Sequence, residues 1–133
     1  MLKKALSLAL VLTATVAATA IAAPSTFQGT CSNIEFVYAN NQATLSAVCL
    51  RSNGTSNPTT LTLQGISNQG GNLVQGSGAS TFQQSCGNIQ INVSSNGSQV
   101  TLSALCRTSG GSINATSLPL NGIGNNNGTL TQQ

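Results

Sequence analysis

The stretch TLSAVCLRSNG, from Thr44 to Gly54, returns downstream as TLSALCRTSGG, from Thr101 to Gly111. The copies lie 55 residues apart at their first cysteines (86 − 31) and 57 apart at their second (106 − 49). Further matching segments are STFQGTCSNI (Ser25–Ile34) with STFQQSCGNI (Ser80–Ile89), LTL (Leu61–Leu63) with LPL (Leu118–Leu120), and GNL (Gly71–Leu73) with GTL (Gly128–Leu130). Two copies of one unit predict a pseudo-symmetric pair rather than a solenoid.

Each copy shows the alternation of apolar and polar residues that is typical of half-buried strands. The segment IQINV, Ile89–Val93, alternates in this way. In the segment QVTLSALC, the residues predicted to share one face are Val100, Leu102, Ala104 and Cys106. Asn96-Gly97 predicts a two-residue type I′ turn, and Asn40-Asn41 takes the same place in the first copy. The sequence therefore predicts an all-β fold built from hairpins, with at most short turns at the two STFQ segments.

The N-terminal residues 1–22 have the features of a secretory signal peptide. Lys3 and Lys4 form a basic start, an apolar run rich in Ala and Leu follows, and Ala20-Ile21-Ala22 suits cleavage before Ala23. The run is short and diluted with Ala and Thr for a membrane anchor. We expect a secreted, extracellular protein that has no membrane segment after cleavage and a single domain over 23–133, with repeat 1 at about 24–75 and repeat 2 at about 80–133.

Charged residues are scarce, which excludes several function classes. After cleavage, Arg51, Arg107 and Glu35 remain, a net charge of +1, so there is no basic patch for nucleic acid. General acid–base catalysis needs histidine or paired carboxylates, and the chain has no histidine and one acidic residue. The sequence predicts a protein that is not an enzyme and uses no cofactor or metal.

Four cysteines in a small secreted chain imply two disulfides, with three possible connectivities. The duplication favours the pairing in which each copy closes on itself, Cys31–Cys49 and Cys86–Cys106. On the loop-entropy estimate each such closure stabilises the fold by roughly 3 kcal/mol. One copy alone buries little apolar surface, so we expect both copies to share a core.

The rest of the surface is rich in Asn, Gln, Ser, Thr and Gly. Neutral amides and hydroxyls donate and accept hydrogen bonds, which suits sugar hydroxyls. The same residues also serve as ordinary solvated loops, so composition leaves both interpretations open.

The order of these segments resembles the cyanovirin-N homology family: a Phe before Cys-x-N, then TLSA-x-C with a polar loop, L-x-L, and GNL or GTL, all repeated once. The resemblance covers about Pro24 to Gln133. It implies a pseudo-two-fold symmetric fold of cyanovirin-N type with triple-stranded sheets, hairpins exchanged between the repeats and one disulfide per repeat. It also implies a lectin that binds high-mannose oligosaccharides, without metal, at two sites.

Carried over by position, the resemblance places one sugar site at each end of the molecule. The implied residues of site 1 are Pro24, Ser25, Thr26, Thr30, Leu50, Ser52, Asn53, Asn125, Asn126 and Asn127. The implied residues of site 2 are Ser67, Asn68, Gly70, Thr81, Gln84, Ser85, Arg107, Thr108 and Ser109.

This chain departs from the family at positions where acidic residues accept hydrogen bonds from mannose. Those positions are occupied by Leu50, Ser67, Gly70, Gln84 and Asn127. A charged acceptor contributes about 1.5–3 kcal/mol, against about 0.5–1.5 kcal/mol for a neutral one. We expect weak mannose binding, an altered sugar preference, or one inactive site, with site 2 favoured by Arg107 and Thr108.

The sequence therefore predicts a secreted lectin for mannose-type oligosaccharides. The alternative is the same fold without sugar affinity, acting as a structural or protein-binding extracellular module. The Gly- and Ser-rich segment QGSGAS, Gln75–Ser80, predicts a flexible linker between the repeats. A monomer is the expected state, and such a linker also permits a domain-swapped dimer.

Overall fold

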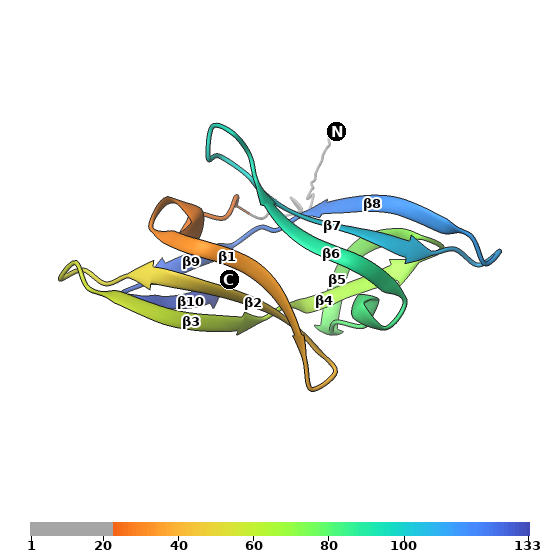
Figure 1. The fold of residues 1–133 in the computed structure, drawn as a ribbon, viewed down its shortest axis with the longest axis horizontal. Coiled ribbons are helices and arrows are strands. Elements are labelled where there is room, and N and C mark those ends of the chain that lie inside the picture. The colour runs from red at the N-terminus through yellow and green to blue at the C-terminus, as the bar shows by residue number, and fades with distance from the viewer. Residues whose placement is uncertain (1–22) are drawn as a thin grey trace, which may run out of the picture.

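The computed structural model describes residues 23–133, which form an elongated all-β protein (Figure 1). The predicted signal peptide, residues 1–22, lies outside the described residues. Over residues 23–133, no helix has the length and apolar character needed to cross a membrane. The predicted fold class is confirmed.

Each repeat supplies one three-stranded antiparallel sheet, one two-stranded hairpin and one 3-10 turn. In the first repeat these are η2 (Phe27–Gly29), β1 (Cys31–Ala39), β2 (Gln42–Leu50), β3 (Ser56–Thr62), β4 (Gln64–Gln69) and β5 (Asn72–Ala79). In the second they are η3 (Phe82–Gln84), β6 (Cys86–Val93), β7 (Val100–Arg107), β8 (Ile113–Pro119), β9 (Ile123–Asn126) and β10 (Thr129–Gln132). The order of elements is thus the same in both halves, as the repeat predicts.

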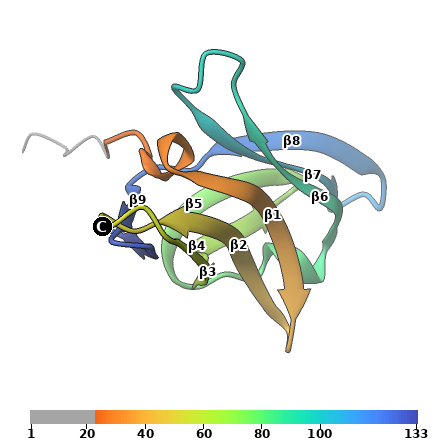
Figure 2. The ribbon, with the colours of Figure 1, turned by 60° about the vertical axis from the view of Figure 1, so that its left-hand side comes forward.

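The hairpins are exchanged between the repeats, as the resemblance implies. Hairpin β9–β10 lies beside β3 of the first repeat, and hairpin β4–β5 lies beside β8 of the second (Figures 1 and 2). The backbone N–H of Leu130 donates to Thr59 Oγ1 at 3.1 Å, and the N–H of Leu73 donates to Thr116 Oγ1 at 3.1 Å. Neither repeat completes its packing without the other.

Side chains from both repeats form one core. Phe27 and Phe82 are fully buried, and their 3-10 turns fold them inward from the start of each repeat. The predicted inner face of β7 is confirmed, because all four of its residues are buried: Val100, Leu102, Ala104 and Cys106. The matching residues of β2 are buried too, so the alternation within each strand decides which face meets the core.

Both predicted disulfides are confirmed. Cys31 pairs with Cys49 across β1 and β2, and Cys86 pairs with Cys106 across β6 and β7. Each bridge therefore joins residues that are already opposite each other in the strand register.

The two hairpin turns differ from each other. Asn40 and Asn41 both have positive φ, at 53° and 61°, as a type I′ turn requires. The type I′ turn predicted at Asn96-Gly97 is wrong, because β6 ends at Val93 and β7 begins only at Val100. There the N–H of Gly97 donates to the carbonyl of Ser94 at 2.9 Å, and Gly97 alone has positive φ. The two residues inserted in the second repeat lengthen this turn.

The segment predicted as a flexible linker is instead mostly part of a strand. Gln75 pairs with Ile66 and Ala79 pairs with Gln64, so β5 continues along β4 to the end of the first repeat. The register shift between these pairs accommodates residues 76–78 as a bulge.

Two buried serine hydroxyls bridge the end of each three-stranded sheet and the start of the hairpin that follows it. Ser25 Oγ donates to the carbonyl of Leu120 at 2.6 Å and accepts from the N–H of Ile123 at 3.0 Å. In the other half, Ser80 Oγ donates to Leu63 O at 2.7 Å and accepts from Ile66 N at 3.0 Å. Each hydroxyl satisfies two backbone groups that would otherwise be buried without partners.

We predict that Ser25→Ala and Ser80→Ala each lower the free energy of unfolding by about 1–3 kcal/mol, because a buried carbonyl and N–H lose their partner. Denaturant titration measures this loss. Ser32→Ala, at an exposed position of β1, is the matched control and is expected to leave stability unchanged. Equal stabilities for all three variants would contradict the bridging role.

Candidate functional site

The two ends of the molecule are built alike, each from elements of both repeats. We define end 1 as the β2–β3 loop (51–55), the β9–β10 turn and the residues after η2. End 2 is the β7–β8 loop (108–112), the β4–β5 turn and the residues after η3. Exchange of the hairpins is what brings each turn against its loop.

One asparagine joins the three parts at each end. At end 1, Asn125 Nδ2 donates to Thr30 Oγ1 and to Leu50 O, both at 2.9 Å, and its Oδ1 accepts from the N–H of Gly128 at 2.7 Å. These contacts bring together several residues of predicted site 1.

At end 2, Asn68 occupies the equivalent place. Its Nδ2 donates to Ser85 Oγ and to Arg107 O, both at 2.9 Å, and its Oδ1 accepts from the N–H of Gly71 at 2.8 Å. The structure thus brings Asn68, Ser85 and Arg107 of predicted site 2 together.

The ends differ at the turn residue before this glycine, which is Asn127 at end 1 and Gly70 at end 2. Asn127 Oδ1 accepts hydrogen bonds from both the N–H and the Oγ of Ser52, each at 2.9 Å. Gly70 has no side chain to reach Ser109, the equivalent of Ser52. End 1 is therefore closed by a contact between turn and loop that end 2 lacks.

The two arginines also differ in their surroundings. Arg51 donates to Thr55 Oγ1 at 3.3 Å, to Ser56 O at 3.4 Å and to Asn57 Oδ1 at 2.7 Å. Arg107 is exposed, and no residue within 23–133 accepts a hydrogen bond from its guanidinium. Arg51 thus supports its own loop, whereas Arg107 is available to a ligand.

Beside Arg107 lies a shallow cavity of about 390 Å³. Gln84 and Ser85 of predicted site 2 line it, together with Asn88. Leu105 and Ile113, which are 40% and 60% exposed, also line it, so the cavity combines hydrogen-bonding groups with apolar surface. Sequence reasoning missed Asn88, Leu105 and Ile113, although the alternation along QVTLSALC places Leu105 on the outward face.

The other residues of predicted site 1 occupy different surroundings. Pro24 bridges to Asn121 and lines, with Thr26, a separate cavity of about 180 Å³. Ser25 is 3% exposed and its hydroxyl is fully engaged. Asn53 Oδ1 accepts from the backbone N–H of Thr55, and Asn126 is exposed in β9. These residues do not all converge on one surface.

Predicted site 2 is also divided. Thr81, with Gln84, lines a groove of about 350 Å³ beside the β1–β2 turn. Thr108 Oγ1 shares a hydrogen bond of 2.8 Å with Ser112 Oγ inside the β7–β8 loop, and Ser67 is half-buried in β4 opposite Val74. Ser109 is exposed near the tip of the loop. Arg107, Gln84 and Ser85 form the part of site 2 that is both assembled and accessible.

No set of three or more His, Cys, Asp or Glu side chains within residues 23–133 is grouped so that it could hold a metal ion. Among the residues that the structure describes, the groups available at both ends are amides, hydroxyls, backbone atoms and the free guanidinium of Arg107. Their chemistry is hydrogen bonding to a neutral or anionic ligand.

The family model of the CVNH domain matches residues 27–131. The chain therefore belongs to the cyanovirin-N homology family, as the repeated segments indicated. No curated protein sequence matches the chain.

Several solved structures share the fold. Microvirin, solved in complex with mannobiose, is 31% identical with a TM-score of 0.62, over 83% of this chain and 99% of microvirin. The N. crassa member is 22% identical with a TM-score of 0.66, over 81% of this chain and 98% of that chain. A MoCVNH3 variant in complex with (N-GlcNAc)4 is 20% identical with a TM-score of 0.62, over 86% and 100%.

We predict that Asn127→Gly speeds hydrogen exchange at the Ser52 N–H by about tenfold, because the variant removes its acceptor. The reciprocal variant Gly70→Asn should slow exchange at the Ser109 N–H. Gly70 has φ +62°, which asparagine tolerates, and open space where its Cβ would lie. Amide exchange followed by NMR measures both. Unchanged rates in both variants would contradict the difference between the ends.

Proposed function

We propose that this protein is a carbohydrate-binding protein that recognises neutral mannose-type oligosaccharides at end 2. The observation that carries the proposal is the exposed Arg107 guanidinium beside an open cavity. Family membership and the mannobiose complex of microvirin support a sugar as the ligand.

The groups around Arg107 match the chemistry of a sugar ring. The guanidinium donates hydrogen bonds, whereas the Gln84 amide and the Ser85 hydroxyl each donate and accept. Leu105 and Ile113 offer apolar contact to the C–H face of a ring. No carboxylate lines this cavity, so every acceptor there is neutral and we expect weak affinity.

End 1 is expected to contribute less. Its loop is held to the β9–β10 turn by Ser52 and Asn127, and Arg51 is engaged by its own loop. A sugar at end 1 would have to compete with these hydrogen bonds. The position equivalent to Arg107 is Leu50, whose side chain neither donates nor accepts.

We predict that Arg107→Ala weakens binding of mannobiose by about tenfold, the loss expected from a hydrogen bond to a charged donor. Leu50→Ala, at the equivalent position of end 1, is the matched control and should leave binding unchanged. Titration calorimetry or NMR titration measures both affinities. If Leu50→Ala lowers the affinity and Arg107→Ala does not, end 1 is the site.

A protein without sugar affinity would support the alternative, a structural or protein-binding module of the same fold. A glycan array distinguishes the two, because the lectin proposal requires selective retention of oligosaccharides. Array binding that also includes chitin-type sugars would change the proposed sugar class but leave the site in place.

We also propose that the protein is secreted, supported by the two disulfides and by the features of residues 1–22. The expected outcome in a secreting host is a protein that begins at Ala23 and contains no free thiol. Intact mass spectrometry before and after reduction measures this. A retained N-terminal segment would contradict the proposal.

A further inference from the structure

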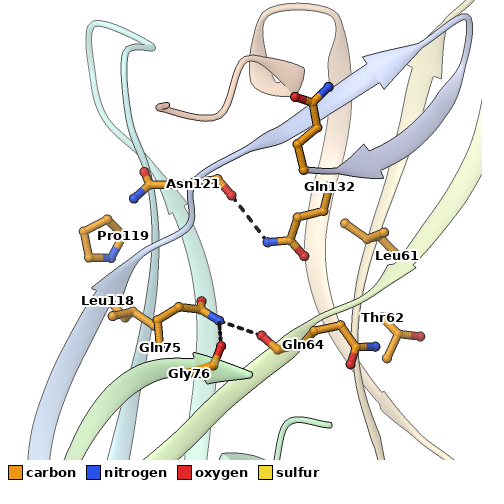
Figure 3. A pocket seen from close by; sticks show the side chains of 10 residues that line it. Leu61, Thr62, Gln64, Gln75, Gly76, Leu118, Pro119, Asn121 and Gln132 are labelled. Carbon is orange, nitrogen blue, oxygen red and sulfur yellow. Dashed lines mark hydrogen bonds between the residues drawn. The ribbon is translucent and has the colours of Figure 1, made fainter. Parts of the chain in front are cut away.

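A larger pocket lies away from both ends, at the waist of the molecule. Its volume is about 710 Å³, within the range of about 300–1,000 Å³ typical of small-ligand sites. It lies where each three-stranded sheet passes into its exchanged hairpin, and strands of both repeats line it (Figure 3). We call it the waist pocket.

The residues of the waist pocket come in pairs related by the internal repeat. Leu61 of β3 corresponds to Leu118 of β8, and Gln75 of β5 corresponds to Gln132 of β10, each 57 residues apart in the chain. Figure 3 shows Leu61 and Leu118 on opposite sides, with the two glutamines between them. The pocket therefore lies on the pseudo-two-fold axis.

Hydrogen bonding orients the two glutamine amides in the same way. Gln75 Nε2 donates to the carbonyl of Gln64 at 2.8 Å and to that of Gly76 at 3.1 Å. Gln132 Nε2 donates to the carbonyl of Asn121 at 3.4 Å, the residue equivalent to Gln64. Because each NH₂ faces a backbone carbonyl, each Oε1 lies at the opposite edge of its amide. No donor within residues 23–133 reaches either Oε1.

The walls provide the complementary apolar surface. Leu61 and Leu118 are half-buried and pack against the core, so their exposed edges are held in place. No basic residue lines the pocket, which disfavours an anionic ligand. A purely apolar ligand is disfavoured too, because it would remove the exposed amides from water without replacing their hydrogen bonds.

From this geometry we propose that the waist pocket is a third ligand site, distinct from both ends, for a neutral, hydroxyl-rich molecule of disaccharide size. Hydroxyls of the ligand donate to Gln75 Oε1 and Gln132 Oε1, and its C–H faces contact Leu61 and Leu118. Because the acceptors and the leucines are related by the pseudo-two-fold axis, a ligand with two equivalent halves can make both sets of contacts at once.

The test uses α,α-trehalose as the probe, since its two glucose units are equivalent. We expect NMR titration of the labelled protein to shift the side-chain amide signals of Gln75 and Gln132 and the backbone N–H of Gly76. The signals of Arg107 and Ser109 should not move. The double variant Gln75→Met/Gln132→Met keeps side-chain length but removes both acceptors, and should weaken binding by about tenfold or more.

The matched control is Gln90→Met, at an exposed position of β6 whose side chain makes no hydrogen bond within residues 23–133. It should bind trehalose like the unmodified protein. Thermal unfolding of all variants confirms that the double variant is folded. The absence of shifts at the waist overturns the proposal, as does unchanged affinity in the folded double variant. Shifts confined to end 2 overturn it as well.

The outcome of the trehalose experiment is independent of the function proposed for end 2. Arg107→Ala should leave trehalose binding at the waist unchanged, and Gln75→Met/Gln132→Met should leave mannobiose binding at end 2 unchanged. Loss of one activity without the other therefore identifies which proposal fails.

Discussion

Each hairpin of this protein completes its hydrogen bonding on the sheet of the other repeat. Asn57 Nδ2 donates to the carbonyl of Gly128 at 2.8 Å, and Asn114 Nδ2 donates to the carbonyl of Gly71 at 2.8 Å. Both glycines are buried, and a Cβ at either would lie 2.7 Å from a side-chain carbon of the facing loop. The close approach of turn and sheet thus depends on glycine at these two positions. Without the exchange, neither half would have a closed core or an assembled end.

The exchange also explains why each end is built from both repeats. A loop from one repeat meets a turn from the other at each end, although the cavity beside Arg107 is lined by residues of the second repeat. At the waist pocket, the two segments in which the chain passes from a three-stranded sheet into an exchanged hairpin face each other. One topological feature, the exchange of hairpins, therefore underlies both the assembly of the two ends and the waist pocket.

Small departures from symmetry then make the ends different. Asn127 and Gly70 share backbone conformation, with φ of 50° and 62°, yet only the asparagine reaches across to the loop. Likewise, the guanidinium of Arg51 is directed back to Asn57, whereas Arg107 sits one position earlier in its repeat and extends into solvent. A duplicated fold can in this way keep its core while its two ends diverge.

Several features were predictable from local sequence because they depend on local chemistry. The alternation in β7 predicted its buried face, the duplication predicted both disulfides, and Asn40-Asn41 predicted a tight turn. The turn at Asn96-Gly97 was predicted wrongly, because the dipeptide favours positive φ but does not determine how many residues separate the strands. Here Ser94 and Ser98 extend the turn, and the Asn96 side chain accepts from the N–H of Ser98.

The repeat, the strands, the core residues and the pairing of cysteines were predictable from the amino-acid sequence, since all follow from periodicity along the chain. Which polar groups are free became clear only from the folded arrangement of the chain. Ser25 and Ser109 are both serines near predicted sites, but one is buried between two backbone groups and the other is exposed. The partners of a polar side chain come from residues distant in sequence, so composition cannot distinguish a structural hydroxyl from an available one. The waist pocket has the same origin, because its paired leucines and glutamines meet only when the repeats exchange their hairpins.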